Sequence, residues 1–190
     1  TLLKASAASA VLGSVGKPTV ALAQQDLAVS FQSFNFRGRF VRHRNFLADL
    51  DPVSSASPEL DKFDATFVFR HGGNANLGDG FASWEARNPG LEGHFLRHQN
   101  FRLVLHKLPP PGSPDRRLFD LDSTFIIDKE SLAAPHDRRF QSFRALNFST
   151  RYLRHRNFHL FLDELDKSKQ LDREDATFET LDGLMPQRSS

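Results

Sequence analysis

The chain has 190 residues, which is enough for one domain with a hydrophobic core and a short extension. It contains no cysteine, which excludes a disulfide framework, a thiol nucleophile and a Cys-based zinc site. Its 25 lysines and arginines nearly balance its 23 aspartates and glutamates, and its 39% hydrophobic content is ordinary for a globular protein. No apolar run approaches the roughly 18–20 residues that a membrane-spanning helix needs.

Residues 1–23 differ from the rest of the chain in composition. They contain no acidic residue, Lys4 precedes an apolar stretch, and Ala21-Leu22-Ala23 has the small-x-small pattern that signal peptidase prefers. The segment TLLKASAASA resembles the residues that follow the arginine pair of a twin-arginine export signal, without the pair itself. We therefore expect an export signal with a truncated start, and a secreted protein that has no membrane contact after its removal. The alternative is an amphipathic helix of the fold.

The charge of the remaining chain argues against a nucleic-acid partner. The segment RYLRHRNFHLFL, residues 151–162, interleaves basic and aromatic residues as a nucleic-acid-binding surface does. However, residues 1–23 hold two lysines, so residues 24–190 carry 23 basic and 23 acidic side chains and are formally neutral. A protein that binds a phosphate backbone presents an excess of Lys and Arg. We therefore expect no nucleic-acid partner.

Three related blocks recur in the same order along the chain, at about residues 30–71, 80–130 and 139–181. Each repeat has an opening such as FQSFN, a central block with the motif R-H-x-N-F, and a closing block such as DATF. The central blocks are RFVRHRNFLADL, HFLRHQNFRLVL and RYLRHRNFHLFL. This threefold match predicts that residues 24–190 form a single domain.

The central and closing blocks alternate in hydrophobicity, which predicts β-strands. In the third central block Phe158, Leu160 and Leu162 share one face, which we expect to be buried. The loops between central and closing blocks are rich in Pro, Gly and Ser, and we expect no helix there. One copy cannot bury its own aromatic face, and a propeller usually needs at least four blades. The sequence therefore predicts an all-β fold, a β-trefoil with pseudo-threefold symmetry.

The single tryptophan and the single tyrosine occupy positions that hold Phe in the other repeats. Trp84 aligns with Phe34 and Phe143, and we assign it to the core. Tyr152 lies at another position that is Phe in both other copies, and we expect it near the core. Few Trp or Tyr side chains then remain for a flat sugar-stacking platform, so a sugar-binding version of this protein would use small polar pockets.

Polar residues that recur in all three repeats are the candidates for a binding site, because a core does not require them. Each repeat has a His with an Arg before it and an Asn two places after it, and an Asp follows 20–24 residues later. Two interpretations remain open. The Asp caps a turn and bonds the His or Arg as a purely structural group, or each repeat forms a pocket whose carboxylate and imidazole bind sugar hydroxyls. The His and Asp residues are His43, His98, His155, Asp64, Asp122 and Asp175.

Catalysis and metal binding are less well supported by the same pattern. One His and one Asp per repeat form a thin ligand set for a metal ion. Glycoside hydrolysis requires two carboxylates that flank one bond, and the repeating pattern supplies one. The sequence has no G-x-S-x-G, Walker-type or H-E-x-x-H motif. We therefore expect no catalytic residue, no metal and no cofactor.

The pattern aromatic-x-R-H-x-N-F followed by D-A-T-F resembles the arabinose-binding domain at the C-terminus of fungal α-L-arabinofuranosidase B, family 42 of the carbohydrate-binding modules. The resemblance covers about residues 30–181 and occurs three times. It implies a β-trefoil that binds arabinofuranosyl side chains of arabinoxylan or arabinan, with one pocket per repeat. It further implies that the His, the residue after it and the Asp contact the sugar. These residues are His43, Arg44 and Asp64; His98, Gln99 and Asp122; and His155, Arg156 and Asp175.

The chain departs from the family pattern at two points. The residue after the His can be Tyr in the family, whereas here it is Arg or Gln, which removes an aromatic wall. The second repeat reads RHQN and LDST and carries a longer NPGLEG insertion, so its pocket departs furthest. We predict a secreted, monomeric, non-catalytic domain that binds an arabinose-decorated polysaccharide, either alone or as a fragment of a larger protein. The alternatives are an α-L-arabinofuranosidase-type hydrolase, or a fragment of one, and a protein-binding trefoil.

Overall fold

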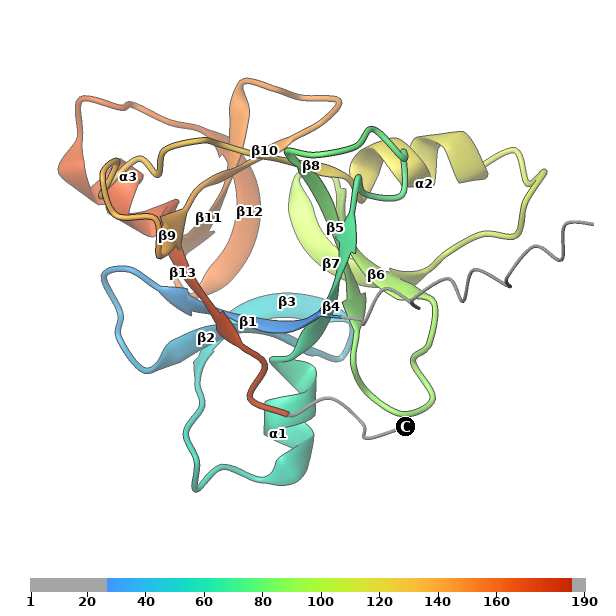
Figure 1. The fold of residues 1–190 in the computed structure, drawn as a ribbon, viewed down its shortest axis with the longest axis horizontal. Coiled ribbons are helices and arrows are strands. Elements are labelled where there is room, and N and C mark those ends of the chain that lie inside the picture. The colour runs from blue at the N-terminus through green and yellow to red at the C-terminus, as the bar shows by residue number, and fades with distance from the viewer. Residues whose placement is uncertain (1–26, 186–190) are drawn as a thin grey trace, which may run out of the picture.

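The structure is a computed structural model that describes residues 27–185, and in this range the protein is all-β (Figure 1). Thirteen strands in the described range form one antiparallel sheet, accompanied by three helices of six or seven residues. The export signal expected in residues 1–23 lies outside the described residues. None of the helices between residues 27 and 185 has the length and apolar character required to cross a membrane.

The same order of elements occurs in three successive segments, residues 27–71, 81–127 and 140–182. The first segment contains β1 (Leu27–Ser33), β2 (Arg39–Arg44), β3 (Leu47–Pro52), α1 (Glu59–Asp64) and β4 (Phe67–His71). The second contains β5 (Phe81–Ala86), β6 (His94–Gln99), β7 (Arg102–Lys107), α2 (Arg116–Asp122) and β8 (Phe125–Ile127). The third contains β9 (Phe140–Gln141), β10 (Phe143–Ala145), β11 (Arg151–Arg156), β12 (His159–Glu164), α3 (Gln170–Asp175) and β13 (Phe178–Asp182).

The sheet closes on itself, and the three segments meet at its centre. Because β11 pairs with both β10 and β12, the path β11-β10-β8-β5-β6-β7-β12 returns to its start. Strands β3, β7 and β12, one from each segment, all pair with one another. Figure 1 shows the three helices at the periphery, spaced around these central strands. Closure of this kind removes exposed strand edges from the centre of the domain.

The core consists mainly of aromatic side chains from the inner strands. Phe31, Trp84 and Phe143, one from each segment, have ring centroids 4.9–5.5 Å apart in edge-to-face arrangements. Trp84 is buried as the sequence predicts, and Tyr152 is buried as well. A second set of fully buried phenylalanines packs beside these rings: Phe67, Phe125 and Phe178.

The structure corrects the alignment of the opening blocks by three residues. Trp84 is equivalent to Phe31 and Phe143, whereas Phe34 lies outside this central cluster. The string FQSF occurs in both the first and the third segment. An alignment that matches these two strings displaces the first segment by three residues from its structural register. The correct register follows from three equivalent pairings: Gln32 with Phe40, Glu85 with Phe95, and Arg144 with Tyr152.

Each R-H-x-N-F motif forms the tip of a β-hairpin. In the first hairpin the turn residues Asn45 and Phe46 have φ angles of 51° and 63°, as in a type I′ turn. The turn rotates the aromatic side chain away from the inner face, so Phe158 in the third hairpin is exposed. The expectation that Phe158 belongs to the buried face is therefore wrong, while the burial of Leu160 and Leu162 is confirmed.

Three backbone hydrogen bonds join the hairpin tips to the neighbouring segments. In each, the carbonyl of the turn phenylalanine accepts from the N–H of a core leucine in the next segment. The pairs are Phe46 to Leu105 at 2.8 Å, Phe101 to Leu162 at 2.8 Å, and Phe158 to Leu50 at 2.7 Å.

The prediction that the loops contain no helix is wrong, because α1, α2 and α3 each precede the last strand of their segment. One or two helical turns are too short to show a hydrophobic period. Such helices are marginal alone and need tertiary contacts. Here each helix ends at a buried aspartate: Asp64, Asp122 or Asp175.

Candidate functional site

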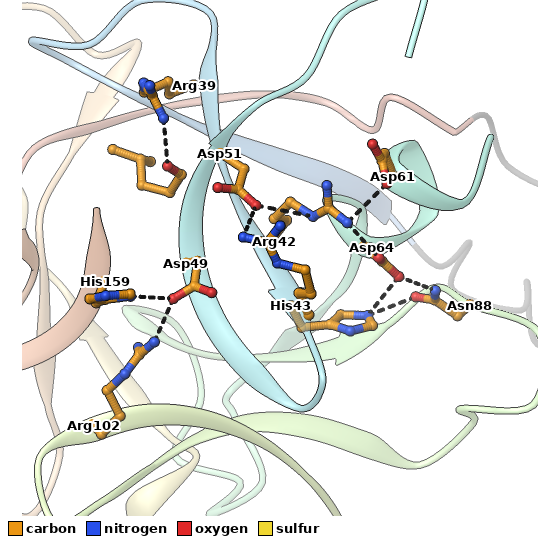
Figure 2. Close-up of polar contacts among 12 residues, drawn as sticks. Arg39, Arg42, His43, Asp49, Asp51, Asp61, Asp64, Asn88, Arg102 and His159 are labelled. Carbon is orange, nitrogen blue, oxygen red and sulfur yellow. Dashed lines mark hydrogen bonds and ion pairs between the residues drawn. The ribbon is translucent and has the colours of Figure 1, made fainter. Parts of the chain in front are cut away.

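A buried polar cluster joins the β2–β3 hairpin to α1 and to the residues after β5 (Figure 2). Arg42 Nη2 donates to Asp64 Oδ2 at 3.0 Å, and Asn88 Nδ2 donates to Asp64 Oδ1 at 2.6 Å. His43 Nε2 lies 2.8 Å from Asn88 Oδ1 and 3.7 Å from Asp64 Oδ1. Because Asn88 uses its amide N–H on Asp64, its oxygen accepts from the imidazole. The four side chains thus form one chain of hydrogen bonds.

The second segment builds the same cluster. Arg97 forms an ion pair with Asp122, and Asn147 Nδ2 donates to Asp122 Oδ1 at 2.7 Å. His98 Nε2 lies 2.9 Å from Asn147 Oδ1 and 3.3 Å from Asp122 Oδ1. The asparagine again belongs to the following segment.

The third cluster is completed by the first segment. Arg154 Nη2 donates to Asp175 Oδ2 at 2.6 Å, and Asn35 Nδ2 donates to Asp175 Oδ1 at 2.8 Å. His155 Nε2 lies 3.0 Å from Asn35 Oδ1 and 3.4 Å from Asp175 Oδ1. The three clusters therefore close a ring in which each segment supplies one asparagine to its neighbour.

The local fold explains why an arginine accompanies each aspartate. Each aspartate is the last residue of its helix, where the helix dipole disfavours a negative charge. The arginine on the adjacent strand neutralises that charge, which a buried carboxylate requires. Each aspartate accepts hydrogen bonds from the arginine and the asparagine side chains, so the bond to Arg that the structural interpretation expects is present.

The imidazoles at the first and third clusters favour the neutral form. Burial lowers the pKa of His43 below its usual value, against the opposing effects of the Asn88 hydrogen bond and of Asp64. Burial likewise lowers the pKa of His155, while Asp175 acts in the opposite direction. A neutral imidazole has one donor nitrogen and one acceptor nitrogen, and since Nε2–H of His43 and of His155 donates to an asparagine oxygen, Nδ1 is the acceptor nitrogen of each ring.

Open cavities lie against the first and second clusters. The first has a volume of about 450 Å³ and is lined by His43, Asp64 and Asn88 together with the apolar Phe46 and Leu60. The second has a volume of about 370 Å³, with an equivalent lining. Both volumes lie in the range of about 300–1,000 Å³ that is common for small-molecule sites.

Exposed apolar side chains concentrate around these clusters. Seven of the ten large hydrophobic side chains that are exposed within the described range occupy equivalent positions at the clusters. Grouped exposed apolar residues mark binding sites more often than scattered ones do. These residues are Phe46 and Leu60 at the first cluster, Leu118 and Phe148 at the second, and Phe36, Phe158 and Leu171 at the third.

The aromatic walls differ among the three clusters. Phe101 and Phe148 meet edge to face with ring centroids 5.1 Å apart, and Phe36 and Phe158 do so at 5.2 Å. At the first cluster Pro89 takes the place of the second aromatic residue. Phenylalanine thus supplies an aromatic wall even though Arg or Gln follows the histidine.

In the structure each predicted His–Asp pair lies close together. The residue after the histidine lies outside these polar clusters. Arg44 and Gln99 line the first and second cavities from the neighbouring strand position. Arg44 forms an ion pair with Asp51 at 3.0 Å, and Arg156 lies 3.6 Å from Asp163, so both arginines are engaged along their own hairpins. No group of three or more His, Asp or Glu side chains in residues 27–185 is placed to hold a metal ion.

The asparagines are the members of the clusters that sequence reasoning missed. With the corrected register, Ser followed by an aromatic residue and then by Asn four places later recurs in all three segments. The three-residue shift in the alignment hid this pattern. The asparagines are Asn35, Asn88 and Asn147.

Three similarly built polar clusters around one closed sheet define an all-β domain with repeated surface sites. The chain belongs to the alpha-L-arabinofuranosidase B (ABFB) domain family, whose model matches residues 29–180. It is 34% identical over 117 residues to a probable alpha-L-arabinofuranosidase B of Aspergillus clavatus, covering 62% of this chain and 20% of that protein. The chain therefore spans about a fifth of the length of this curated relative.

Solved structures show the same fold. A GH54 a-l-arabinofuranosidase soaked with a cyclic sulfate inhibitor matches with a TM-score of 0.69 and 24% identity, over 92% of this chain and 34% of that one. An arabinofuranosidase complexed with arabinofuranosyl-alpha-1,2-xylobiose matches with a TM-score of 0.67 and 23% identity, over 84% and 32%. A structure described as a BEL beta-trefoil matches with a TM-score of 0.53 and 12% identity, over 82% and 92%.

Proposed function

We propose that this chain is a β-trefoil carbohydrate-binding domain that recognises arabinofuranosyl side chains of arabinoxylan or arabinan through up to three pockets. The trefoil assignment is supported by the three segments of equivalent element order and by their shared central strands β3, β7 and β12. The likeness to a β-trefoil structure supports it further.

The observation that carries the proposal is the coincidence, three times, of a polar cluster with an exposed aromatic or apolar rim. A sugar presents hydroxyl groups on its edges and C–H groups on its faces, so its recognition requires both kinds of wall. Each carboxylate has about four lone-pair positions, of which the arginine and the asparagine use two. The remaining positions can accept hydrogen bonds from sugar hydroxyls, and the ring face can pack on Phe46 or its equivalents.

The cavities fit binding better than hydrolysis. Among the described residues, Asp64 is the acid that lines the first cavity and Asp122 is the acid that lines the second. Hydrolysis of a glycosidic bond ordinarily uses two carboxylates on opposite sides of the bond. A single carboxylate with a neutral imidazole suffices for recognition.

Three weak pockets would bind a branched polymer more strongly than a single branch. Once one pocket is occupied, neighbouring branches of the same chain are present at high local concentration, which raises the overall affinity. This expectation is consistent with a secreted monomer, and both secretion and the monomeric state stay predictions from the sequence.

Affinity electrophoresis tests the proposal directly. We expect the protein to be retarded in gels that contain arabinoxylan and to migrate freely in gels that contain the same xylan stripped of arabinose. Equal mobility in both gels would contradict arabinose recognition. Release of free arabinose by the purified protein would favour the hydrolase alternative, and recovery of a protein partner without any polysaccharide binding would favour a protein-binding trefoil.

A further inference from the structure

A further cavity of about 440 Å³ shares lining residues with the second pocket. It lies between the β6–β7 hairpin and α2, and its polar lining includes Gln99, His106, Lys107 and Asp115. Arg97 and Gln99 line both this cavity and the second sugar pocket. The two cavities therefore share part of their walls.

The hairpin of the second segment has lost an acidic residue that the other hairpins keep. In the register of the ladders, Phe40 pairs with Asp51 and Tyr152 pairs with Asp163, whereas Phe95 pairs with His106. The equivalent of Arg44 and Arg156 is Gln99. The first and third segments thus carry an ion pair at this place on the hairpin surface, whereas the second segment has Gln99 and His106 instead.

The adjacent helix has lost a second acidic residue. Arg42 Nη2 donates to Asp61 at 2.9 Å, and Arg154 Nη1 donates to Asp172 at 3.1 Å, in each case three residues before the cluster aspartate. The equivalent residue of α2 is Phe119, and the guanidinium of Arg97 lies 5.2 Å from its ring centroid. Arg97 therefore has a ring where the other two arginines have a carboxylate.

These exchanges remove the excess of negative charge that the other two segments carry at this place. The hairpin also ends in Lys107 where the equivalent residues are Pro52 and Glu164, and Lys107 makes no ion pair within residues 27–185. The charges can be compared at the positions equivalent to Arg97, Gln99, His106, Lys107, Phe119 and Asp122. At these positions the first segment has two cations and three carboxylates, and the third segment has two cations and four carboxylates. The second has two cations and one carboxylate, with Asp115 as a further acid in the cavity lining.

We propose that this cavity binds an anionic sugar unit, a uronosyl residue next to the arabinosyl branch held in the second pocket. The inference rests on the proposed function. The guanidinium of Arg97, the ammonium of Lys107 and the amide of Gln99 are donors suited to a carboxylate. Burial, together with the nearby Arg97 and His94 side chains, lowers the pKa of His106. The imidazole therefore stays neutral without a ligand and can take up a proton beside an anion.

Calorimetric titration with a matched pair of ligands tests the inference. The pair is a xylo-oligosaccharide that carries one glucuronosyl group next to an arabinosyl branch, and the methyl ester of the same compound, which removes the charge. We expect the acid to bind the full chain about fivefold more tightly than the ester, equivalent to about 1 kcal/mol. Equal affinities for acid and ester would overturn the inference.

Two variants locate the effect. His106→Asp restores the acid of the other segments and should abolish the preference for the acid, while Lys107→Ala should reduce it. His136→Asp makes the same change of charge at an exposed loop position outside the cavity and should leave the preference intact. If His136→Asp abolishes the preference as well, the effect is a long-range one and the cavity is not the site.

A neutral arabinosyl xylo-oligosaccharide separates this inference from the proposed function. Its binding should be the same for the parent chain and for His106→Asp, which also shows that the variant is folded. If the parent chain fails to bind it, the proposed function is wrong. The comparison of acid with ester decides the anionic site by itself.

Discussion

Phe46→Gly separates a binding role of the turn phenylalanines from a structural one. The second residue of a type I′ turn favours glycine, yet Phe46 occupies it with a φ of 63°. A bulky side chain in the left-handed region costs about 1–2 kcal/mol. Such strain is common at functional sites.

The structure predicts that this substitution leaves stability almost unchanged. Phe46 is 51% exposed, so its truncation forfeits about half of the roughly 1.5–3 kcal/mol that full burial contributes, or about 1 kcal/mol. The greater backbone freedom of glycine costs roughly another 0.5–1 kcal/mol. Relief of the left-handed strain offsets most of this loss. The backbone hydrogen bond from Leu105 to the carbonyl of residue 46 is retained. We expect a net change within about 1 kcal/mol of zero, or roughly 2–4 °C in Tm.

Binding at the first pocket should nevertheless weaken about tenfold, because the substitution removes its aromatic wall. Two-dimensional NMR titration with an arabinosylated xylo-oligosaccharide can read each pocket through its own asparagine side-chain amide, Asn88 for the first. Leu77→Ala truncates a similarly exposed side chain outside the lining of the first pocket, and should lower Tm by roughly 2–4 °C while leaving the titration of Asn88 unchanged. A fall in Tm above roughly 10 °C, or an unchanged titration of Asn88, would refute the reasoning.

Three further predictions concern stability. Asn147→Ala removes one hydrogen bond from each of two buried side chains, Asp122 and His98, and should cost about 2–4 kcal/mol in urea unfolding, whereas a loss below about 0.5 kcal/mol would show that water replaces the amide. Arg102→Ala removes donors to the carbonyls of all three central strands and to Asp49, and should lower the unfolding free energy by about 3–5 kcal/mol; an unchanged urea midpoint would contradict this. Because the pKa values of His43 and His155 are lowered on folding, the unfolded state binds more protons below about pH 6.5. The unfolding free energy should therefore fall as the pH drops from 7.5 to 5.5, and less so in a His43→Gln variant; equal slopes for both proteins would count against it.

Direct substitution of a cluster aspartate is a poorer test of binding than these variants. Asp64→Ala would remove one of the two carboxylates that hold the buried Arg42 and would leave Asn88 without the acceptor of its amide N–H, and breaking a buried ion pair in this way typically costs about 3–5 kcal/mol. Loss of binding in such a variant would not distinguish a missing ligand contact from a disturbed fold. The phenylalanine at the turn provides a cleaner separation.

Sequence patterns predicted the parts of the site that lie within one segment. A His and an Asp recur at similar spacing in each repeat, and this spacing predicted that His155 and Asp175 lie close together. The alternation that buries Leu160 and Leu162 was equally readable. Phe158 broke the pattern because the chain reverses at its left-handed turn, which hydrophobicity alone does not reveal.

Contacts between segments were beyond sequence reasoning. Asn35 completes a cluster whose aspartate lies 140 residues further along the chain, and only the three-dimensional register links them. The sequence did not predict the three short helices for a different reason. Six or seven residues are too few to show an apolar stripe, and the ion pair of the final residue, such as Asp64 with Arg42, joins two parts of the chain that are far apart in sequence.

The exchange of asparagines has a consequence for how such a domain could be built or divided. Each segment supplies the Arg, the His and the Asp of its own polar cluster, and its Asn completes the cluster of the preceding segment, always in the same direction around the ring. A peptide of one segment would possess no finished pocket. Three identical copies joined head to tail would close a cyclic trimer with three identical pockets, because each interface is heterologous and the rotation closes. A circularly permuted chain would retain all three, provided that the cut falls outside the hairpins.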